Sequence, residues 1–182
     1  MSERASEQAK YAVAYTHPDY GMGPSRRAQA IALLSALPRG SYLDVGCGRG
    51  EMMDEAERMG FAPVQGIEVV PGLIDGERVI HGEAHALPFK SGAFDVVSML
   101  DVMEHLLASD SEPVCRELER VARKAVVLTV ANYSHNYHGV ELHITRRPYD
   151  DWHHDFCQWF SGKVERMGTM GSGSEGWVIR LG

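Results

Sequence analysis

The sequence predicts an α/β fold, a three-layer sandwich on a mostly parallel, seven-stranded sheet whose last strand is antiparallel. Short apolar runs typical of strands alternate with stretches of helical periodicity, the pattern of a parallel sheet covered on both faces. A glycine-rich segment, residues 46–50, separates the first such run from the next helix. The last two runs, 163–167 and 177–181, leave no room for a crossover helix, so they must pair in opposite directions.

The expected elements follow one another within a single domain, residues 1–182, in which an arm of residues 1–23 precedes the core of residues 24–182. Pro24 suits the first turn of the first core helix. The predicted strands are 41–45, 63–69, 78–81, 93–99, 125–130, 163–167 and 177–181. The predicted helices are 24–37, 51–59, one through Val102, Leu106 and Leu107, 111–123 and 147–160. The Gly-Ser-Gly-Ser run at 171–174 is turn material.

Composition places the chain among ordinary globular proteins, with 44% hydrophobic and 24% charged residues. No apolar run approaches the roughly 20 residues that cross a bilayer, and the N-terminus does not resemble a secretory signal. We therefore expect a cytoplasmic protein without a membrane partner. The net charge of −7 argues against nucleic acid as a partner, because phosphate contacts need clustered Lys and Arg.

The strongest motif is the segment Leu43–Gly50, with the sequence LDVGCGRG. It follows a strand and opens a helix, which is the context of a glycine-rich cofactor loop. Its glycines allow a sharp turn and close approach to a ligand, and the amides at a helix start favour an anion such as a carboxylate. Asp44 at the strand end could hold an ammonium group or orient the loop. The alternative is a plain turn between strand and helix.

A carboxylate at the end of the second strand completes this constellation. Glu68 follows Gly50 by eighteen residues, and a carboxylate in that position accepts hydrogen bonds from ribose hydroxyls. The spacing of Gly46, Gly48 and Gly50 is G-x-G-x-G, whereas dehydrogenases that bind dinucleotides have G-x-G-x-x-G. Loop and carboxylate together favour a methionine-type cofactor over NAD.

The stretch from Tyr42 to Val130 resembles the class I S-adenosylmethionine-dependent methyltransferases, in particular their small-molecule branch. Besides the loop, the resemblance rests on the segments 82–84 (GEA), 87–89 (LPF) and 94–97 (FDVV). It implies a Rossmann-like methyltransferase fold, S-adenosyl-L-methionine as cofactor and S-adenosyl-L-homocysteine as product, with residues 83 and 84 beside the adenine. The motif and the resemblance together predict these cofactor-binding residues: Asp44, Gly46, Cys47, Gly48, Gly50, Glu68, Val69, Glu83, Ala84 and Asp101.

The methyl acceptor is expected beyond the carboxyl ends of the strands, where ligands of open α/β sheets bind. Methyl transfer needs alignment and, for a hydroxyl acceptor, a general base. Histidine titrates near neutral pH, so His143, then His105, then His135 are the candidate catalytic residues. For each of them the alternative is a capping or surface histidine. The candidate substrate-binding residues are Tyr20, Asn132 and Tyr133.

The arm suits a lid, because Tyr20 is followed by two glycines that could act as a hinge in the run 20–23. The alternative is an amphipathic helix that packs on the sheet through Tyr11, Val13 and Tyr15. Both can hold at once, with the helix packed and only residues 16–23 mobile.

A candidate metal site follows the fourth strand. Asp101, Glu104 and His105 stand at positions i, i+3 and i+4, which share one face of a helix. Two carboxylates and an imidazole can bind a divalent cation. The spacing is similar to the Glu-x-x-Glu-His metal site of ubiquinone-pathway O-methyltransferases. We favour the alternative in which the Glu-His pair caps a helix and lines the pocket without metal.

These features predict a methyltransferase that acts on an oxygen or nitrogen of a small or medium-sized molecule. One alternative is a cofactor-binding module that no longer catalyses and works in an assembly. A nucleic-acid methyltransferase is disfavoured, because the segment 100–103 (LDVM) lacks the Asp/Asn-Pro-Pro-Tyr/Phe pattern of base-amino methylators. The sequence indicates neither the acceptor nor the oligomeric state.

Overall fold

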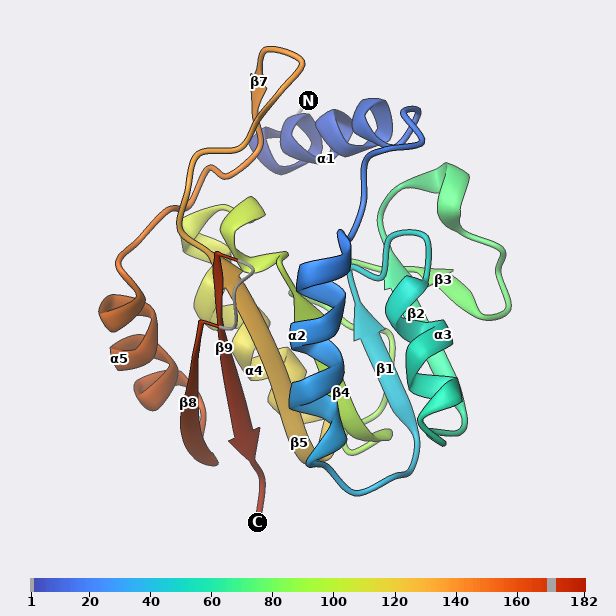
Figure 1. Cartoon of the computed structure of the whole chain (residues 1–182), viewed down its shortest axis with the longest axis vertical. Helices are drawn as coiled ribbons and strands as arrows, with labels where there is room; N and C mark the ends of the chain where they lie inside the picture. Colours follow the sequence, from blue (N-terminus) through green and yellow to red (C-terminus); the bar gives the residue numbers. More distant parts are fainter. Residues whose placement is uncertain (1, 170–172) are drawn as a thin grey trace.

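The computed structural model describes residues 2–169 and 173–182, so residues 171 and 172 of the predicted turn at 171–174 lie outside the described residues. Its main sheet has seven strands in the order β3-β2-β1-β4-β5-β9-β8 (Figure 1). Their bounds are β1 Tyr42–Val45, β2 Val64–Glu68, β3 Val79–His81, β4 Phe94–Leu100, β5 Ala122–Ala131, β8 Lys163–Thr169 and β9 Ser174–Arg180. Neighbouring strands from β3 to β5 pair in parallel, whereas β9 runs antiparallel to β5 and β8. The predicted sheet with an antiparallel last strand is confirmed.

Helices cover both faces of the sheet and make the predicted three layers. On one face, α2 (Pro24–Ser35) and α3 (Glu51–Arg58) pack apolar side chains on alternate residues of the central strands, such as Val96 and Val127. On the other, α4 (Ser111–Val121) and α5 (Tyr149–Trp159) pack on the intervening residues. Because the strands are covered on both sides, β1 is buried along its whole length.

The arm forms a helix, α1 (Glu3–Ala14), which lies across the carboxyl end of the sheet, above β1 and β4 in Figure 1. Ser2 caps it, because the Ser2 hydroxyl accepts a hydrogen bond from the amide of Ala5. The expectation that Val13 packs inward is wrong, since Val13 is 64% exposed. The helix covers the ends of the strands, where only one of its sides meets the core.

The predicted helix through Val102, Leu106 and Leu107 is wrong. Two short 3₁₀ turns take its place, η2 (Met103–His105) and η3 (Ala108–Asp110), and a third, η1 (Pro71–Leu73), follows β2. Asp101 adopts a left-handed conformation (φ 53°), so the chain leaves β4 at an angle that no continuous helix can follow. Hydrogen bonds in both directions between Asp101 and Thr129 fasten this turn to β5.

The segment after β5, where the sequence predicts neither a helix nor a strand, contains a small hairpin. Its strands are β6 (Asn136–Tyr137) and β7 (Val140–Glu141), with left-handed residues His138 and Gly139 in the turn. The hairpin stands beside α1 at the carboxyl end of the sheet (Figure 1). Across residues 2–169 and 173–182, every helix is too short or too polar to cross a bilayer.

Candidate active site

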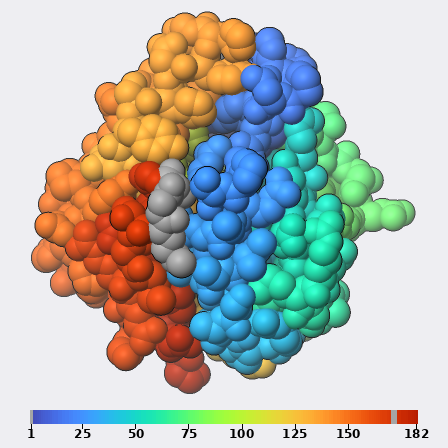
Figure 2. Space-filling model, viewed as in Figure 1, coloured from blue at the N-terminus to red at the C-terminus, as the bar shows by residue number. Residues whose placement is uncertain are grey.

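A pocket opens at the carboxyl ends of β1, β2 and β4, and α1 forms part of its wall. Figure 2 shows this region from outside, where the N-terminal segment in dark blue meets the orange segment that follows β5. The predicted site residues that line the pocket are Tyr20, Asp44, Gly46, Cys47, Glu68, Val69, Glu83, Ala84, Asp101, His105 and His135. The predicted residues that are not part of its wall are Gly48, Gly50, Asn132, Tyr133 and His143.

The glycine loop requires its glycines for two reasons. Gly46, Gly48 and Gly50 all have positive φ, at 75°, 56° and 82°, a conformation that other residues adopt only with strain. A Cβ at position 46 would lie 2.6 Å from Cγ2 of Val102, and one at position 48 would collide with the hydroxyl of Tyr15. The glycines therefore allow side chains of this chain to approach the loop closely, while the amides of Gly46 and Gly48 donate hydrogen bonds to the end of β2.

Glu68 joins the end of β2 to this loop. Its Oε2 accepts a hydrogen bond from the amide of Gly48 at 2.9 Å, and its Oε1 accepts bonds from the amides of Val69 and Val70 at 2.7 and 3.0 Å. The side chain is buried in the pocket wall. A carboxylate has about four acceptor positions, so it keeps capacity for a hydroxyl donor in the pocket.

Asp44 is a buried carboxylic acid at the end of β1. Burial raises its pKa to about 7, although a 2.6 Å hydrogen bond from the hydroxyl of Ser98 opposes this effect. A buried carboxylate is stabilised by a nearby positive charge. The position next to Asp44 therefore suits a cationic group of a ligand.

At the far end of the pocket, α1 is fastened to the core by Arg4. Its guanidinium donates two hydrogen bonds to Asp110, at 2.9 and 2.7 Å, and lies 3.9 Å from Glu83. His85 lies 3.3 Å from the same Glu83 carboxylate. The predicted adenine-side carboxylate thus belongs to a small charged cluster that spans the arm and the core.

The arm is also held over the glycine loop. Arg49 donates hydrogen bonds of 3.0 Å to the carbonyls of Tyr15 and His17, and its guanidinium stands 5.3 Å from the centre of the Tyr15 ring. Burial, with Glu68 nearby, raises the pKa of Tyr15, so its hydroxyl stays neutral. The Tyr15 ring contacts that of Tyr20 edge to face.

The acceptor side of the pocket is formed by Tyr20, His135 and Arg26. The Tyr20 and His135 rings stack at 6.2 Å, and Arg26 reaches from α2 to the carbonyl of Gly21 and to within 3.6 Å of Asp101. In contrast, the predicted substrate residues Asn132 and Tyr133 are exposed outside the pocket. The Tyr133 ring lies instead beside that of His143, with the ring centres 5.1 Å apart.

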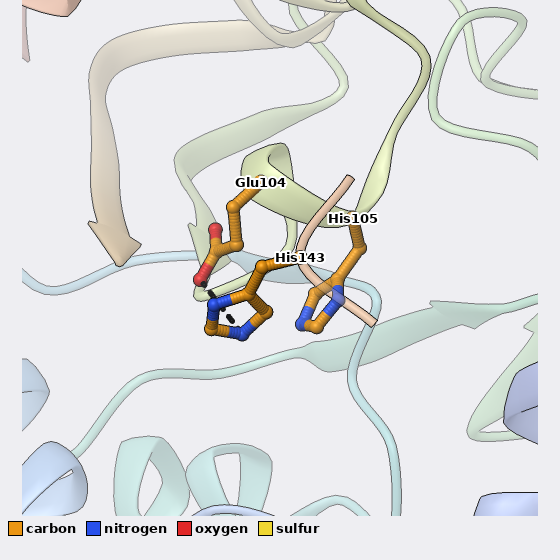
Figure 3. A group of neighbouring side chains, drawn as sticks. All are labelled: Glu104, His105 and His143. Atoms are coloured by element: carbon orange, nitrogen blue, oxygen red, sulfur yellow. Dashed lines mark ion pairs between the residues drawn. The ribbon is translucent and has the colours of Figure 1, made fainter. Parts of the chain in front are cut away.

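Behind this wall, Glu104, His105 and His143 form a compact cluster (Figure 3). One potential metal-ligating atom of each lies within 4.8 Å of the others. Nε2 of His143 is 4.0 Å from Oε1 of Glu104, which also accepts a hydrogen bond from the amide of Ala131. Burial raises the pKa of Glu104 and lowers that of His105 to about 3.

The candidate metal site of Asp101, Glu104 and His105 is therefore corrected at one of its three residues, Asp101. Asp101 precedes η2 in a left-handed turn and bonds to Thr129, so it does not share a helical face with the other two. His143 takes its place in the cluster. His143 was identified from sequence only as a base, because no local spacing connects it to residues 104 and 105.

Sequence reasoning missed three residues that shape the pocket, namely Arg4, Arg26 and Arg49. Arg4 meets its partner across 106 positions, and Arg49 contacts the arm across 34. Such contacts depend on where α1 lies on the core. The only available signal was Arg49, which stands inside the glycine motif.

The order of the strands and the glycine loop with its carboxylate are those of the Rossmann-like methyltransferase fold. The family described as Methyltransferase domain matches residues 43–130, in agreement with the resemblance to the class I S-adenosylmethionine-dependent methyltransferases. This match spans β1 to β5, the part that carries the loop and Glu68.

Known proteins similar to the chain agree with this assignment. Norajmaline N-methyltransferase of Rauvolfia serpentina is 32% identical over 108 residues, covering 52% of this chain and 36% of its own length. The chain thus spans about a third of that relative. Two solved structures share the fold at a TM-score of 0.73, the PH0226 protein of Pyrococcus horikoshii OT3 and a 1,6-didemethyltoxoflavin-N1-methyltransferase of Burkholderia thailandensis. They are 18% and 16% identical, over 96% and 99% of this chain and 99% and 91% of their own.

Proposed function

We propose that the protein transfers a methyl group from S-adenosyl-L-methionine to an oxygen or nitrogen of a small or medium-sized molecule. The observation that carries this proposal is one pocket lined by Asp44 and Glu68 on one side and by Tyr20 and His135 on the other. The similar plant and bacterial enzymes are named for methylation of nitrogen atoms in small molecules, which supports this class of acceptor.

The residues of the pocket fit the cofactor along its length. Asp44 is a buried acid whose charge a positive group would stabilise, so it would hold the ammonium group. The amides at the start of α3, where Glu51 and Met52 line the pocket, would hold the carboxylate. Glu68 would accept hydrogen bonds from the ribose, while Glu83 and Ala84 would border the adenine. The bound cofactor supplies an electrophilic methyl group next to the acceptor.

The acceptor would lie between Tyr20 and His135. Its lone pair forms the new bond to the methyl carbon, while the carbon–sulfur bond breaks and its electron pair remains on sulfur. The proton lost by the acceptor passes to His135, the only one of the three candidate bases that lies in the wall outside the Glu104 cluster. His143 is 1% exposed and stands behind this wall, which makes it a poor direct base.

The net charge of −7 continues to disfavour nucleic acid as the acceptor. Location in the cytoplasm stays a prediction.

Mass spectrometry of small-molecule extracts, incubated with the protein and methyl-labelled cofactor, tests this function. We expect label in a small molecule with wild-type protein and none with Asp44→Ala, which removes the partner for the ammonium group. Binding of S-adenosyl-L-homocysteine without label transfer to any fraction would instead support the non-catalytic module. Label in nucleic acid would overturn the proposed acceptor class.

A further inference from the structure

We propose that Glu104, His105 and His143 form a binding site for a divalent transition-metal ion of the Zn²⁺ type. Two imidazoles and one carboxylate are a donor set found in catalytic zinc sites and in other transition-metal sites. Mg²⁺ and Ca²⁺ prefer sites made of oxygen ligands. Glu104 and His105 come from η2, whereas His143 comes from the segment after the hairpin, so the fold alone brings the set together (Figure 3).

Two buried side-chain atoms of this cluster lack a hydrogen-bond partner within the described part of the chain, which is the arrangement expected where a ligand binds. The side chains of Glu104 and His143 are 0% and 1% exposed. Among residues 2–169 and 173–182, neither Oε2 of Glu104 nor Nε2 of His143 has a hydrogen-bond partner. Buried polar atoms in proteins are nearly always satisfied, and an ion is one of the few explanations for two such atoms in one cluster of ligand side chains.

The hydrogen bonds behind the two rings orient them for metal binding. Nδ1 of His143 lies 2.7 Å from the carbonyl oxygen of Tyr133, and Nδ1 of His105 lies 3.0 Å from that of Leu142. A carbonyl oxygen only accepts, so in each neutral ring the proton sits on Nδ1 and the lone pair is on Nε2. Metal-ligating histidines show this arrangement, in which the second nitrogen donates to a fixed acceptor.

The open side of the cluster faces the acceptor end of the pocket. His105 lines the pocket, and the His135 ring, also in the pocket wall, lies 5.0 Å from that of His143. Three protein ligands leave coordination positions for a substrate atom. Tyr11 of α1 contacts Nδ1 of His105 at 3.0 Å, so the arm that closes the pocket also supports a ligand.

A cation here identifies the acceptor class, and this step rests on the proposed methyl transfer. A metal ion binds oxygen donors of a substrate and lowers the pKa of a bound hydroxyl. The acceptor would therefore be a hydroxyl-bearing molecule, methylated on that oxygen. His105 and His143 would then serve as metal ligands, with their lone pairs unavailable for proton transfer.

Titration of the chelator-treated full chain with Zn²⁺ by calorimetry, and with Co²⁺ by visible absorption, tests the site. We expect one ion per chain, with an affinity at least tenfold lower in His143→Ala and in Glu104→Gln. His154→Ala, which removes an exposed histidine of α5, should bind like the wild type. Asp101→Asn should also keep the ion, because Asp101 is outside the cluster.

Three results would overturn the proposal: no stoichiometric binding by wild-type protein, unchanged affinity in both ligand variants, or loss of binding only in Asp101→Asn. The Co²⁺ spectrum of the wild type gives a readout that does not depend on the folding of any variant, since a four-coordinate Co²⁺ ion has intense visible bands and the six-coordinate aqueous ion has weak ones. Binding of S-adenosyl-L-homocysteine, measured on the same samples, separates this result from the cofactor site. If the protein binds Zn²⁺ but transfers no methyl group, the metal site is supported and the proposed methyltransferase function is contradicted.

Discussion

The amide of Gly48 donates a 2.9 Å hydrogen bond to Oε2 of Glu68, and this contact joins the loop after β1 to the end of β2. The other oxygen of Glu68 holds the next two amides of its own strand end. The carboxylate assigned to the ribose therefore also fixes the shape of the loop. Its removal should affect the cofactor in two ways, through a lost ligand contact and through a loosened loop.

Glu68→Gln should weaken binding of S-adenosyl-L-homocysteine by about 1–3 kcal/mol, roughly 5- to 150-fold, because hydrogen bonds to a charged acceptor are lost. Calorimetry measures the affinity. Glu77→Gln, an exposed change in the turn before β3, is the matched control and should bind like the wild type. Equal affinity in Glu68→Gln and wild type would remove Glu68 from the cofactor site.

Gly48→Ala should displace the arm, because its Cβ would collide with the hydroxyl of Tyr15. Amide exchange of residues 3–20 should become faster, and cofactor affinity should fall. Gly60→Ala is the matched control, since Gly60 also has positive φ (89°) but has no atom within 4 Å of an added Cβ. Adding Tyr15→Ala to Gly48→Ala should recover part of the affinity. Similar exchange rates in Gly48→Ala and Gly60→Ala would show that the arm does not depend on this contact.

The parts of the fold that were predictable are those whose signal is local. The strands of the sheet are apolar runs, and the glycines of the loop from Gly46 to Gly50 predict its backbone conformation directly. The turn at Asp101 was not predictable, because its conformation depends on a bond to Thr129 in another strand. His143 reaches Glu104 only through the hairpin that follows β5, so no spacing in the sequence could place it in the cluster.

Asp44 should make stability depend on pH. Its pKa in the folded protein, about 7, lies above its ordinary value of 3.8, so the folded state holds an extra proton between these values. The contribution of Asp44 to the stability of the ligand-free protein is therefore full below about pH 4, and it is lost as the pH rises through 7. Asp44→Asn removes this loss, and its stability relative to wild type should increase by up to about 4 kcal/mol from pH 4 to pH 8. A difference that stays constant across this range, in denaturant unfolding, would contradict the assignment.

Arg4→Ala should loosen α1 from the adenine side of the pocket, because its two hydrogen bonds to Asp110 connect the helix to the core. Release of S-adenosyl-L-homocysteine should become a few-fold faster in stopped-flow measurements, an effect limited by the partial exposure of the pair. Lys10→Ala is the control, because Lys10 pairs with Glu7 inside α1. The same release rate in both variants would show that the Arg4 contact does not hold the helix closed.

His135→Ala should lower kcat by about 10²–10⁴ if its ring receives the acceptor's proton, with cofactor affinity nearly unchanged. Tyr20→Ala should mainly raise KM for the acceptor, since this ring stacks on His135 in the pocket wall. His138→Ala changes an exposed histidine in the turn of the hairpin that follows His135 and serves as the control. These constants are measured with the acceptor found by labelling. A His135→Ala enzyme with normal kcat would assign the proton to another group or to solvent.

Titration calorimetry of the full chain with S-adenosyl-L-homocysteine, alongside NADH, tests the cofactor assignment most directly. The loop from Gly46 to Gly50, with Asp44 and Glu68, predicts one S-adenosyl-L-homocysteine bound per chain and no heat from NADH. Tight binding of NADH together with no binding of S-adenosyl-L-homocysteine would contradict the account.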